Sequence, residues 1–256
     1  MLLQPKPTDV TQIRSHLLLS GAAAVTRENV RHFNIRAIIN VTKTNHRPIW
    51  FRPGHHSDRS DPGTVYLQIP LEDAEDSQLG AWFQQTSAMI ETHRHQKTSS
   101  DQRSRILVHC QMGISRSVTL ILAYLIQFDH MSLREAYSHV NHLRPGVLPN
   151  PGFWQQLVDW ENRQLGITSC KLASLPADLR SLKLEGGGPN GGGGPRLEDY
   201  PVEGQYPDIV WDHIRADWQQ RRTATNRVKQ PRQRRLQRWG CRVANTTGTE
   251  KVPKIF

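Results

Sequence analysis

A cysteine and an arginine stand six positions apart in the segment HCQMGISRS, which covers residues 109–117. A loop that curls at the intervening glycine points successive backbone N–H groups inward, where they and a following helix N-terminus can hold a phosphate dianion. The residues that would bind the phosphate are Gln111, Met112, Gly113, Ile114, Ser115 and Arg116. The spacing therefore predicts a loop that binds a phosphoryl group.

Cys110 is the residue of this loop that could react with phosphorus. The positive surroundings that bind phosphate also stabilise a thiolate, so we expect Cys110 to be ionised at neutral pH and to act as the nucleophile. Arg116 would grip the phosphoryl oxygens with its planar guanidinium, and Ser117 would donate a hydrogen bond to the sulfur as it leaves. His109 is interpreted as an orienting residue rather than as a base.

A buried structural cysteine is the alternative interpretation, because isolated cysteines of intracellular proteins are most often core residues. Against it stand five residues at fixed offsets, a pattern that a chain of this length would contain by chance on the order of once in ten thousand times. They are His109, Cys110, Gly113, Arg116 and Ser117. The pattern therefore favours a catalytic cysteine.

The flanking residues predict that the loop lies between a strand and a helix. Residues 105–110 form a short apolar run typical of a strand, and residues 117–128 form a mostly apolar helix. Further strands are predicted at 13–19, 35–41 and 65–70, and further helices at 26–33, 77–95, 132–143 and 150–165. This alternation predicts an α/β fold with a central, mostly parallel, twisted sheet flanked by helices.

Three of the predicted helices begin with a capping signal. Ser77 can cap the helix at 77–95, and Ser132 with Glu135 forms the S-x-x-E capping box. Asn150 followed by Pro151 reads as an N-cap with proline at the first helical position. We interpret capping as the primary role of Asn150.

The 256 residues divide into a globular part and a polar tail. We predict an N-terminal extension at 1–10, a catalytic domain at 11–166, a Gly-rich linker at 167–195 and a basic, largely disordered tail at 196–256. Residues 171–256 hold 16 Lys and Arg against nine Asp and Glu, so most of the net charge of +10 lies there. Within the tail, apolar residues of 206–220 stand near helical spacing.

The loop matches the H-C-x-x-G-x-S-R-S signature of cysteine-dependent protein phosphatases, and residues 11–166 resemble a small atypical dual-specificity phosphatase. The matching segments are LLLSG, IINVT, IPLED, the signature itself, AYLI and RPGVLPNPGFW. The resemblance implies hydrolysis of phosphotyrosine and of phosphoserine or phosphothreonine in proteins, through a phosphocysteine intermediate and without metal or cofactor. Two features depart from the family pattern, Met112 in place of a small residue and the longer loop at 43–64.

Dephosphorylation by a cysteine needs a proton for the leaving oxygen and later a base for water, and one carboxyl group can serve both steps. The resemblance places this carboxyl on Asp73 in IPLED, with Glu72 and Asp76 as neighbouring candidates. It also implies that Asn150 braces the phosphate loop. His46, His55 and His56 are interpreted as solvated loop residues, because no carboxylate or cysteine pattern completes a metal site.

Two other functions use the same residues. An RNA 5′-phosphatase could employ the same loop, and the basic run at 221–242, with nine Lys and Arg and no acid, could bind nucleic acid or direct nuclear import. A phosphoprotein-binding pseudophosphatase is the non-catalytic alternative, although Cys110, Arg116 and Asp73 together argue against it. A solvated tail without a binding function is equally compatible with the basic run.

Targeting signals are the last property that the sequence addresses. No apolar run suits a secretory signal or a membrane span, so we expect a cytoplasmic and also nuclear protein without a membrane partner. The expected partners are phosphorylated proteins, including kinases.

Overall fold

The computed structural model describes residues 6–43, 64–95, 104–179 and 204–229. A five-stranded sheet with the order β1-β2-β5-β3-β4 forms its centre. Its strands are β1 (Thr11–Arg14), β2 (Leu17–Gly21), β3 (Ile35–Asn40), β4 (Val65–Gln68) and β5 (Arg105–Cys110). Within this sheet only the pairing of β1 with β2 is antiparallel; β2, β5, β3 and β4 run parallel. The predicted α/β fold with a mostly parallel sheet is therefore confirmed.

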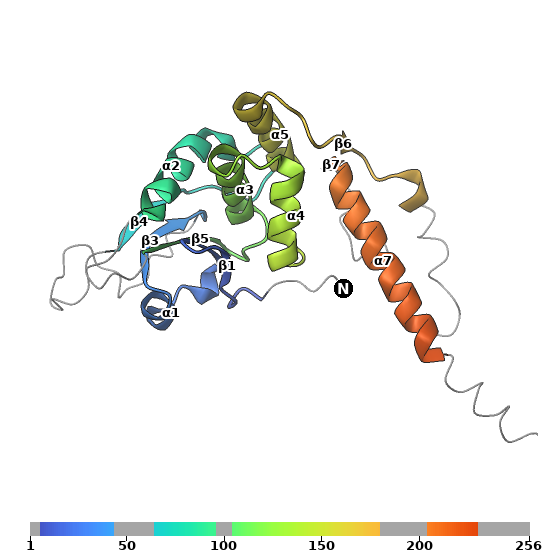
Figure 1. Ribbon diagram of the computed structural model, residues 1–256, viewed down its shortest axis with the longest axis horizontal. Helices are drawn as coiled ribbons and strands as arrows, with labels where there is room; N and C mark the ends of the chain where they lie inside the picture. Colours follow the sequence, from blue (N-terminus) through green and yellow to red (C-terminus); the bar gives the residue numbers. More distant parts are fainter. Residues whose placement is uncertain (1–5, 44–63, 96–103, 180–203, 230–256) are drawn as a thin grey trace, which may run out of the picture.

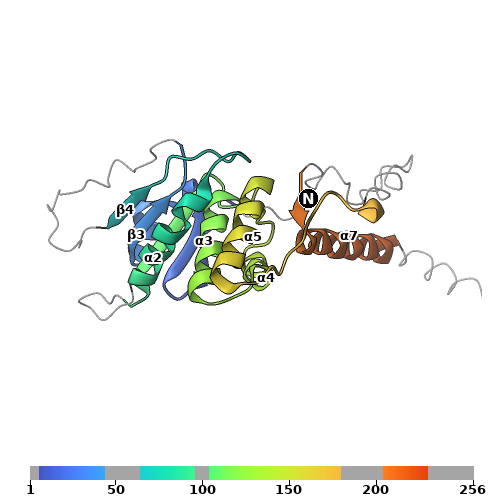
Figure 2. The ribbon, with the colours of Figure 1, turned by 90° about the horizontal axis from the view of Figure 1, so that it is seen from above.

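Helices cover both faces of this sheet, as Figures 1 and 2 show. One face carries α2 (Phe83–Arg94), α3 (Arg116–Phe128), α4 (Leu133–Leu143) and α5 (Pro151–Leu165). The other face carries α1 (Arg27–His32). Parallel strands covered on both faces are expected to be continuously apolar. Accordingly, every residue of β2 is buried.

The core divides between the two faces. The larger cluster lies between the sheet and α2–α5, with α3 at its centre, where all ten residues from Ser117 to Ile126 are buried. The smaller cluster joins the sheet to α1 and consists of Leu18, Val30, Ile35, Ile38 and Leu107. Because α3 is packed on all sides, the residue at its N-terminus is held firmly against the end of β5.

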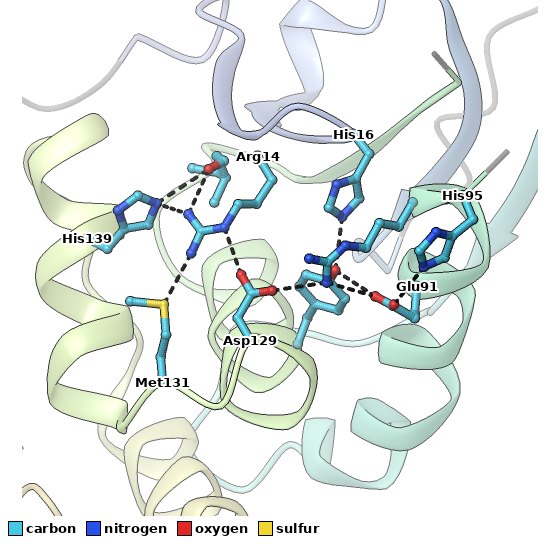
Figure 3. A network of polar contacts seen from close by, with 10 residues as sticks. Arg14, His16, Glu91, His95, Asp129, Met131 and His139 are labelled. Carbon is cyan, nitrogen blue, oxygen red and sulfur yellow. Dashed lines mark hydrogen bonds and ion pairs between the residues drawn. The ribbon is translucent and has the colours of Figure 1, made fainter. Parts of the chain in front are cut away.

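A polar network ties the edge strand β1 to the ends of α2 and α3 (Figure 3). Arg14 Nε donates to Asp129 Oδ2 at 2.7 Å, and its Nη2 lies 3.2 Å from the sulfur of Met131. Asp129 also pairs with Arg94 at 3.3 Å. These contacts link the C-terminal ends of α2 and α3 to β1, and so hold the antiparallel edge of the sheet in place.

Two predicted boundaries were wrong. The strand predicted at 13–19 is two strands, because a turn at residues 15–16 reverses the chain between β1 and β2. Ser77 does not cap the following helix, which begins with a 3-10 turn, η2 (Leu79–Trp82), before α2. The carbonyl of Ser77 instead accepts a hydrogen bond of 2.9 Å from Gln156 on α5.

The folded part of the chain extends beyond the predicted end of the domain at residue 166. Two short strands, β6 (Leu172–Ala173) and β7 (Tyr206–Pro207), pair antiparallel, and α7 (Asp208–Lys229) follows. Trp211 and Ile214 of α7 belong to the larger core cluster. The helical spacing noted at 206–220 is thus confirmed, and the catalytic unit includes residues assigned from sequence to a linker and a tail.

Several predictions fall outside the described residues. The loop at 44–63, with His46, His55 and His56, lies there, as do residues 180–203 and 230–256. Among the helices that the structure does describe, none combines the length and apolarity that crossing a membrane requires.

Candidate active site

The predicted phosphate loop lies at the C-terminal end of β5, in the middle of the parallel strands, and leads directly into α3. This edge is where ligands of open α/β sheets bind, because loops there leave the strands in the same direction. Cys110 is the last residue of β5 and Arg116 the first of α3. The strand, loop and helix arrangement predicted from the sequence is therefore confirmed.

The carbonyl groups of the loop are bonded to its surroundings. The carbonyl of Gln111 accepts from Ala22 N at 3.0 Å, and that of Ile114 accepts from Leu148 N at 2.9 Å. The carbonyls of Met112 and Gly113 both accept from the Arg144 guanidinium, at 3.3 and 3.0 Å. The fifth carbonyl, that of Ser115, accepts from the amide and the hydroxyl of Thr119.

This bonding determines where the amides of the loop point. In a trans peptide the C=O and the next N–H face opposite ways, so outward carbonyls at 111–115 direct the N–H groups of 112–116 inward. The amide of Gly113 accordingly donates to Cys110 Sγ at 3.3 Å. Successive inward amides at the start of a helix form a site for an anion.

Gly113 is the residue that permits this curl. Its φ is +70°, and a Cβ there would lie 2.6 Å from the backbone carbonyl of Ser20. Any other residue would have to push the loop away from β2 or adopt a strained left-handed conformation. The positive φ and the close approach to Ser20 are the physical reasons for the glycine that the sequence predicted at a tight turn.

The sulfur of Cys110 is buried and receives a second hydrogen bond. Ser117 Oγ donates to it at 3.2 Å, which matches the role predicted for this hydroxyl. His109 is also buried, and its Nδ1 lies 3.3 Å from the carbonyl oxygen of Cys110. That contact is compatible with an orienting role for His109.

Arg116 and Asp73 lie together beside the loop. The Arg116 guanidinium donates to the carbonyl of Leu71 at 3.0 Å, and its Nε lies 3.5 Å from Asp73 Oδ2, an ion pair without hydrogen-bond geometry. Asp73 Oδ1 accepts from Ser115 Oγ at 2.7 Å and from Asn150 Nδ2 at 2.8 Å. The carboxylate is thus anchored through one oxygen, while about a third of its side chain is exposed.

A pocket of about 320 Å³ opens over the sulfur. Its lining residues are Asp73, Cys110, Met112, Ile114, Ser115, Arg116, Leu148, Asn150 and Tyr206. The structure therefore brings together the predicted nucleophile, arginine and acid around one cavity. Met112, the departure from the family pattern, is 39% exposed at this pocket.

The other acid candidates are placed differently. Glu72 forms an exposed ion pair with Lys43, and this hydrogen bond and charge lower the pKa of Glu72, which makes it a poor proton donor. Neither Glu72 nor Asp76 lines the pocket. The geometry therefore favours Asp73.

Asn150 combines the two roles considered for it. Its side-chain oxygen accepts from Phe153 N at 3.0 Å, which caps α5, and its side-chain nitrogen donates to Asp73. Its backbone amide also donates to Ser115 Oγ at 3.1 Å. One residue thereby joins the start of α5, the acid and the phosphate loop.

Sequence reasoning missed two residues of the site. Arg144 is 2% exposed and, besides the two loop carbonyls, donates to the carbonyls of Lys6 and Asp9 and to the Thr11 hydroxyl. Its burial lowers the pKa of Arg144, whereas Asp9 and, less strongly, Cys110 act in the opposite direction. Tyr206 comes from β7, outside the predicted domain. Only Arg144 stood in a recognisable motif, RPGVLPNPGFW, and nothing in the sequence signalled Tyr206.

A nucleophilic thiol at the end of a parallel strand, inside an anion-binding loop and beside an arginine and a carboxylate, defines a cysteine-dependent phosphatase. Residues 17–163 match the model of the dual specificity phosphatase catalytic domain. The chain belongs to the dual specificity phosphatase family and is a cysteine-dependent protein phosphatase. The family resemblance inferred from the loop is thereby confirmed.

Relatives from this family match about two thirds of the chain. Dual specificity protein phosphatase 14 of Homo sapiens is 33% identical over 168 residues, which cover 65% of this chain and 76% of the relative. Dual specificity protein phosphatase 21 of Homo sapiens is 31% identical over 176 residues, with 68% and 83% covered. The crystal structure of human DUSP28 is similar with a TM-score of 0.50 and 28% identity, and 62% of this chain and 97% of that chain are covered.

Proposed function

We propose that Cys110, Arg116 and Asp73 carry out the phosphatase reaction of this protein in two steps. In the first, the Cys110 thiolate attacks phosphorus in line, the phosphorus–oxygen bond to the substrate side chain breaks, and Asp73 gives its proton to the leaving oxygen. The inward amides and Arg116 stabilise the charge that develops on the three equatorial oxygens. The product of this step is a phosphocysteine.

The second step returns the enzyme to its starting state. Asp73, now a carboxylate, takes a proton from a water molecule that attacks phosphorus, and the sulfur leaves as a thiolate. The hydrogen bond from Ser117 stabilises the negative sulfur as it departs. The water supplies the fourth oxygen of the inorganic phosphate that is released, and the proton on Asp73 is available for the next cycle.

The observation that carries this proposal is the set of five outward carbonyls at 111–115, which aims the loop amides at the Cys110 sulfur. The same pocket presents Asp73, whose Oδ1 is held by Ser115 and Asn150. A nucleophile, an anion site and a proton donor then lie within one cavity. Phosphotyrosine and phosphoserine or phosphothreonine in proteins, including kinases, are the substrates that we propose for it.

Cys110→Ser tests this proposal, with Cys170→Ser as the matched control because Cys170 is also buried but lies away from the pocket. We expect Cys110→Ser to abolish turnover of a peptide that carries phosphotyrosine and phosphothreonine, and Cys170→Ser to retain it. Full activity of Cys110→Ser would contradict the assignment. A parallel assay with 5′-triphosphate RNA tests the alternative substrate, and capture of phosphoproteins by Cys110→Ser from a cell extract tests the class of partner.

Two further proposals concern the place and the partners of the protein. We infer that it works in the cytoplasm and the nucleus, which imaging of the tagged full chain would test.

The basic run at 221–242 supports nucleic-acid binding as a secondary property. Deleting 230–256, which removes five of the nine Lys and Arg of this run, should then weaken salt-sensitive RNA binding, and unchanged binding would contradict it.

A further inference from the structure

Tyr206 lines the active-site pocket although it lies far along the chain from the other lining residues. Those come from the acid loop, the phosphate loop and the segment that precedes α5. Tyr206 belongs to β7, and it is 6% exposed. An aromatic side chain from outside the sheet domain therefore completes the wall of the catalytic pocket.

The backbone around Tyr206 is held by specific contacts. Tyr206 pairs with Ala173 across β6 and β7, and Asp208 N donates to the carbonyl of Lys171 at 2.9 Å. Asp208 also forms an ion pair of 2.5 Å with Arg134 on α4. These bonds attach β7 and the residue that follows it to β6 and to α4.

The ring itself is also fixed. It meets Trp211 edge to face, with 5.5 Å between the ring centroids, and the Trp211 indole N–H donates to the carbonyl of Ala173 at 3.0 Å. Gly204, two residues before Tyr206, has a φ of +93° and lies so close to α5 that a Cβ would stand 2.5 Å from the Pro151 ring. The aromatic wall is thus preorganised rather than formed by the substrate.

The chemical nature of the wall suggests what it contacts. Burial and the carboxylates of Glu75 and Asp73 raise the pKa of Tyr206, so its ring stays neutral at physiological pH. Together with Met112, Ile114 and Leu148 it gives the pocket an apolar rim around the polar phosphate loop. An aromatic ring of a substrate gains edge or stacking contacts from such a wall, whereas a serine or threonine side chain has no ring to offer.

We propose that Tyr206 is a specificity-determining residue, which packs against the aromatic ring of phosphotyrosine and raises the preference for it over phosphothreonine. This inference rests on the proposed function of the Cys110 pocket. It makes the segment around β7 part of the substrate site, and it assigns to the C-terminal part of the chain a role in substrate choice.

The test compares kcat/KM of wild-type protein and Tyr206→Ala on two peptides that differ only in carrying phosphotyrosine or phosphothreonine. We expect Tyr206→Ala to lose about three- to tenfold on the phosphotyrosine peptide and less than twofold on the phosphothreonine peptide. Tyr206→Phe keeps the ring and should retain the wild-type ratio. Equal losses on both peptides, or no loss on either, would overturn the proposal.

Two controls separate the wall from the packing of the segment and from the chemistry. Ile214→Ala removes an apolar contact of α7 away from the pocket and should leave the ratio of the two peptides unchanged. Inhibition by inorganic phosphate, which has no ring, should be the same in wild type and Tyr206→Ala. A changed ratio of kcat/KM for the two peptides in Ile214→Ala would overturn the proposal, because packing of α7 and not the Tyr206 ring would then set the preference. Absence of any Cys110-dependent turnover in the wild type would instead refute the proposed function itself.

Discussion

Two buried cysteines of the described chain lie in opposite chemical surroundings. Cys110 receives hydrogen bonds from Gly113 N and Ser117 Oγ within the phosphate loop. Cys170 belongs to the larger core cluster, where burial raises the pKa of its thiol to about 11, although the hydrogen bond with Ser169 and the charge of Arg134 act in the opposite direction. Cys170 therefore remains a thiol at neutral pH, and burial alone does not make a cysteine of this protein a reagent.

Asp73 is held so that an amide in place of its carboxylate could keep both hydrogen bonds of Oδ1, although it would lose the ion pair of Oδ2 with Arg116. Its Oδ1 accepts two hydrogen bonds, from Ser115 and Asn150, and an asparagine oxygen can accept both. What the amide cannot do is donate a proton to a leaving oxygen. Chemistry and structure can therefore be separated at this position.

We expect Asp73→Asn to lower kcat by about 10²–10⁴-fold on a phosphothreonine peptide, with substrate binding nearly intact, because the proton transfer is lost while the hydrogen bonds with Ser115 and Asn150 can remain. Steady-state kinetics would measure it, with thermal unfolding as the check on folding. Glu72→Gln, which removes an exposed charge outside the pocket, is the matched control and should retain activity. A loss under tenfold for Asp73→Asn would reassign the acid, and Asp76→Asn would be measured next.

At the scale of elements, two helices begin with equivalent caps that have different neighbours. Ser132 caps α4 through a capping box with Glu135, on the exposed surface. Asn150 caps α5 through Phe153 N and in addition bonds to Asp73. Comparing Asn150 with Ser132 therefore separates the effect of a helix cap on stability from an effect of Asn150 on catalysis.

We expect Asn150→Ala and Ser132→Ala each to lower the free energy of unfolding by ~1 kcal/mol, because each removes one helix cap. Only Asn150→Ala should also lower kcat, by about tenfold, since it removes a hydrogen bond to the acid. Denaturant unfolding and turnover of the same peptide would show the difference. An equal effect of both substitutions on turnover would mean that Asn150 acts only through the stability of α5.

At the scale of the whole molecule, the C-terminal segment is a part of the folded unit. Five of its apolar residues are buried and belong to the larger core cluster, namely Tyr206, Ile209, Val210, Trp211 and Ile214. Arg215 adds an exposed ion pair with Asp178, which lies before the segment in sequence. Figures 1 and 2 show α7 extending away from the sheet domain, with its N-terminal end next to β6 and β7.

Deleting 204–256 should lower the melting temperature by roughly 5 °C or more, because burial of each large apolar side chain is worth ~1.5–3 kcal/mol before the cost in chain entropy. Deleting only 230–256 leaves this packing in place and should change the melting temperature little. Scanning calorimetry of the two truncated proteins measures the difference. Equal melting temperatures for the full chain and the 204–256 deletion would show that α7 contributes nothing to the stability of the domain.

The class of reaction and most of the helices and strands could be predicted from the sequence. The phosphate loop, β5, α3 and the caps at Ser132 and Asn150 could be predicted because each depends on residues that are close in the chain. The loop signature implied the nucleophile and the arginine for the same reason. Asp73, at a distance from the loop, was placed only through the resemblance to a family.

Tertiary structure alone decided the contacts between distant segments. Arg144 binds carbonyls of the phosphate loop and of the N-terminal residues, and Tyr206 reaches the pocket from beyond the predicted linker. Arg144 stands in the motif RPGVLPNPGFW and Tyr206 in no motif, but neither contact has a periodic or local signal, because such contacts depend on how helices and strands pack and not on neighbouring residues. The same reason explains why a segment read as a basic tail contributes Trp211 to the core and Tyr206 to the active site.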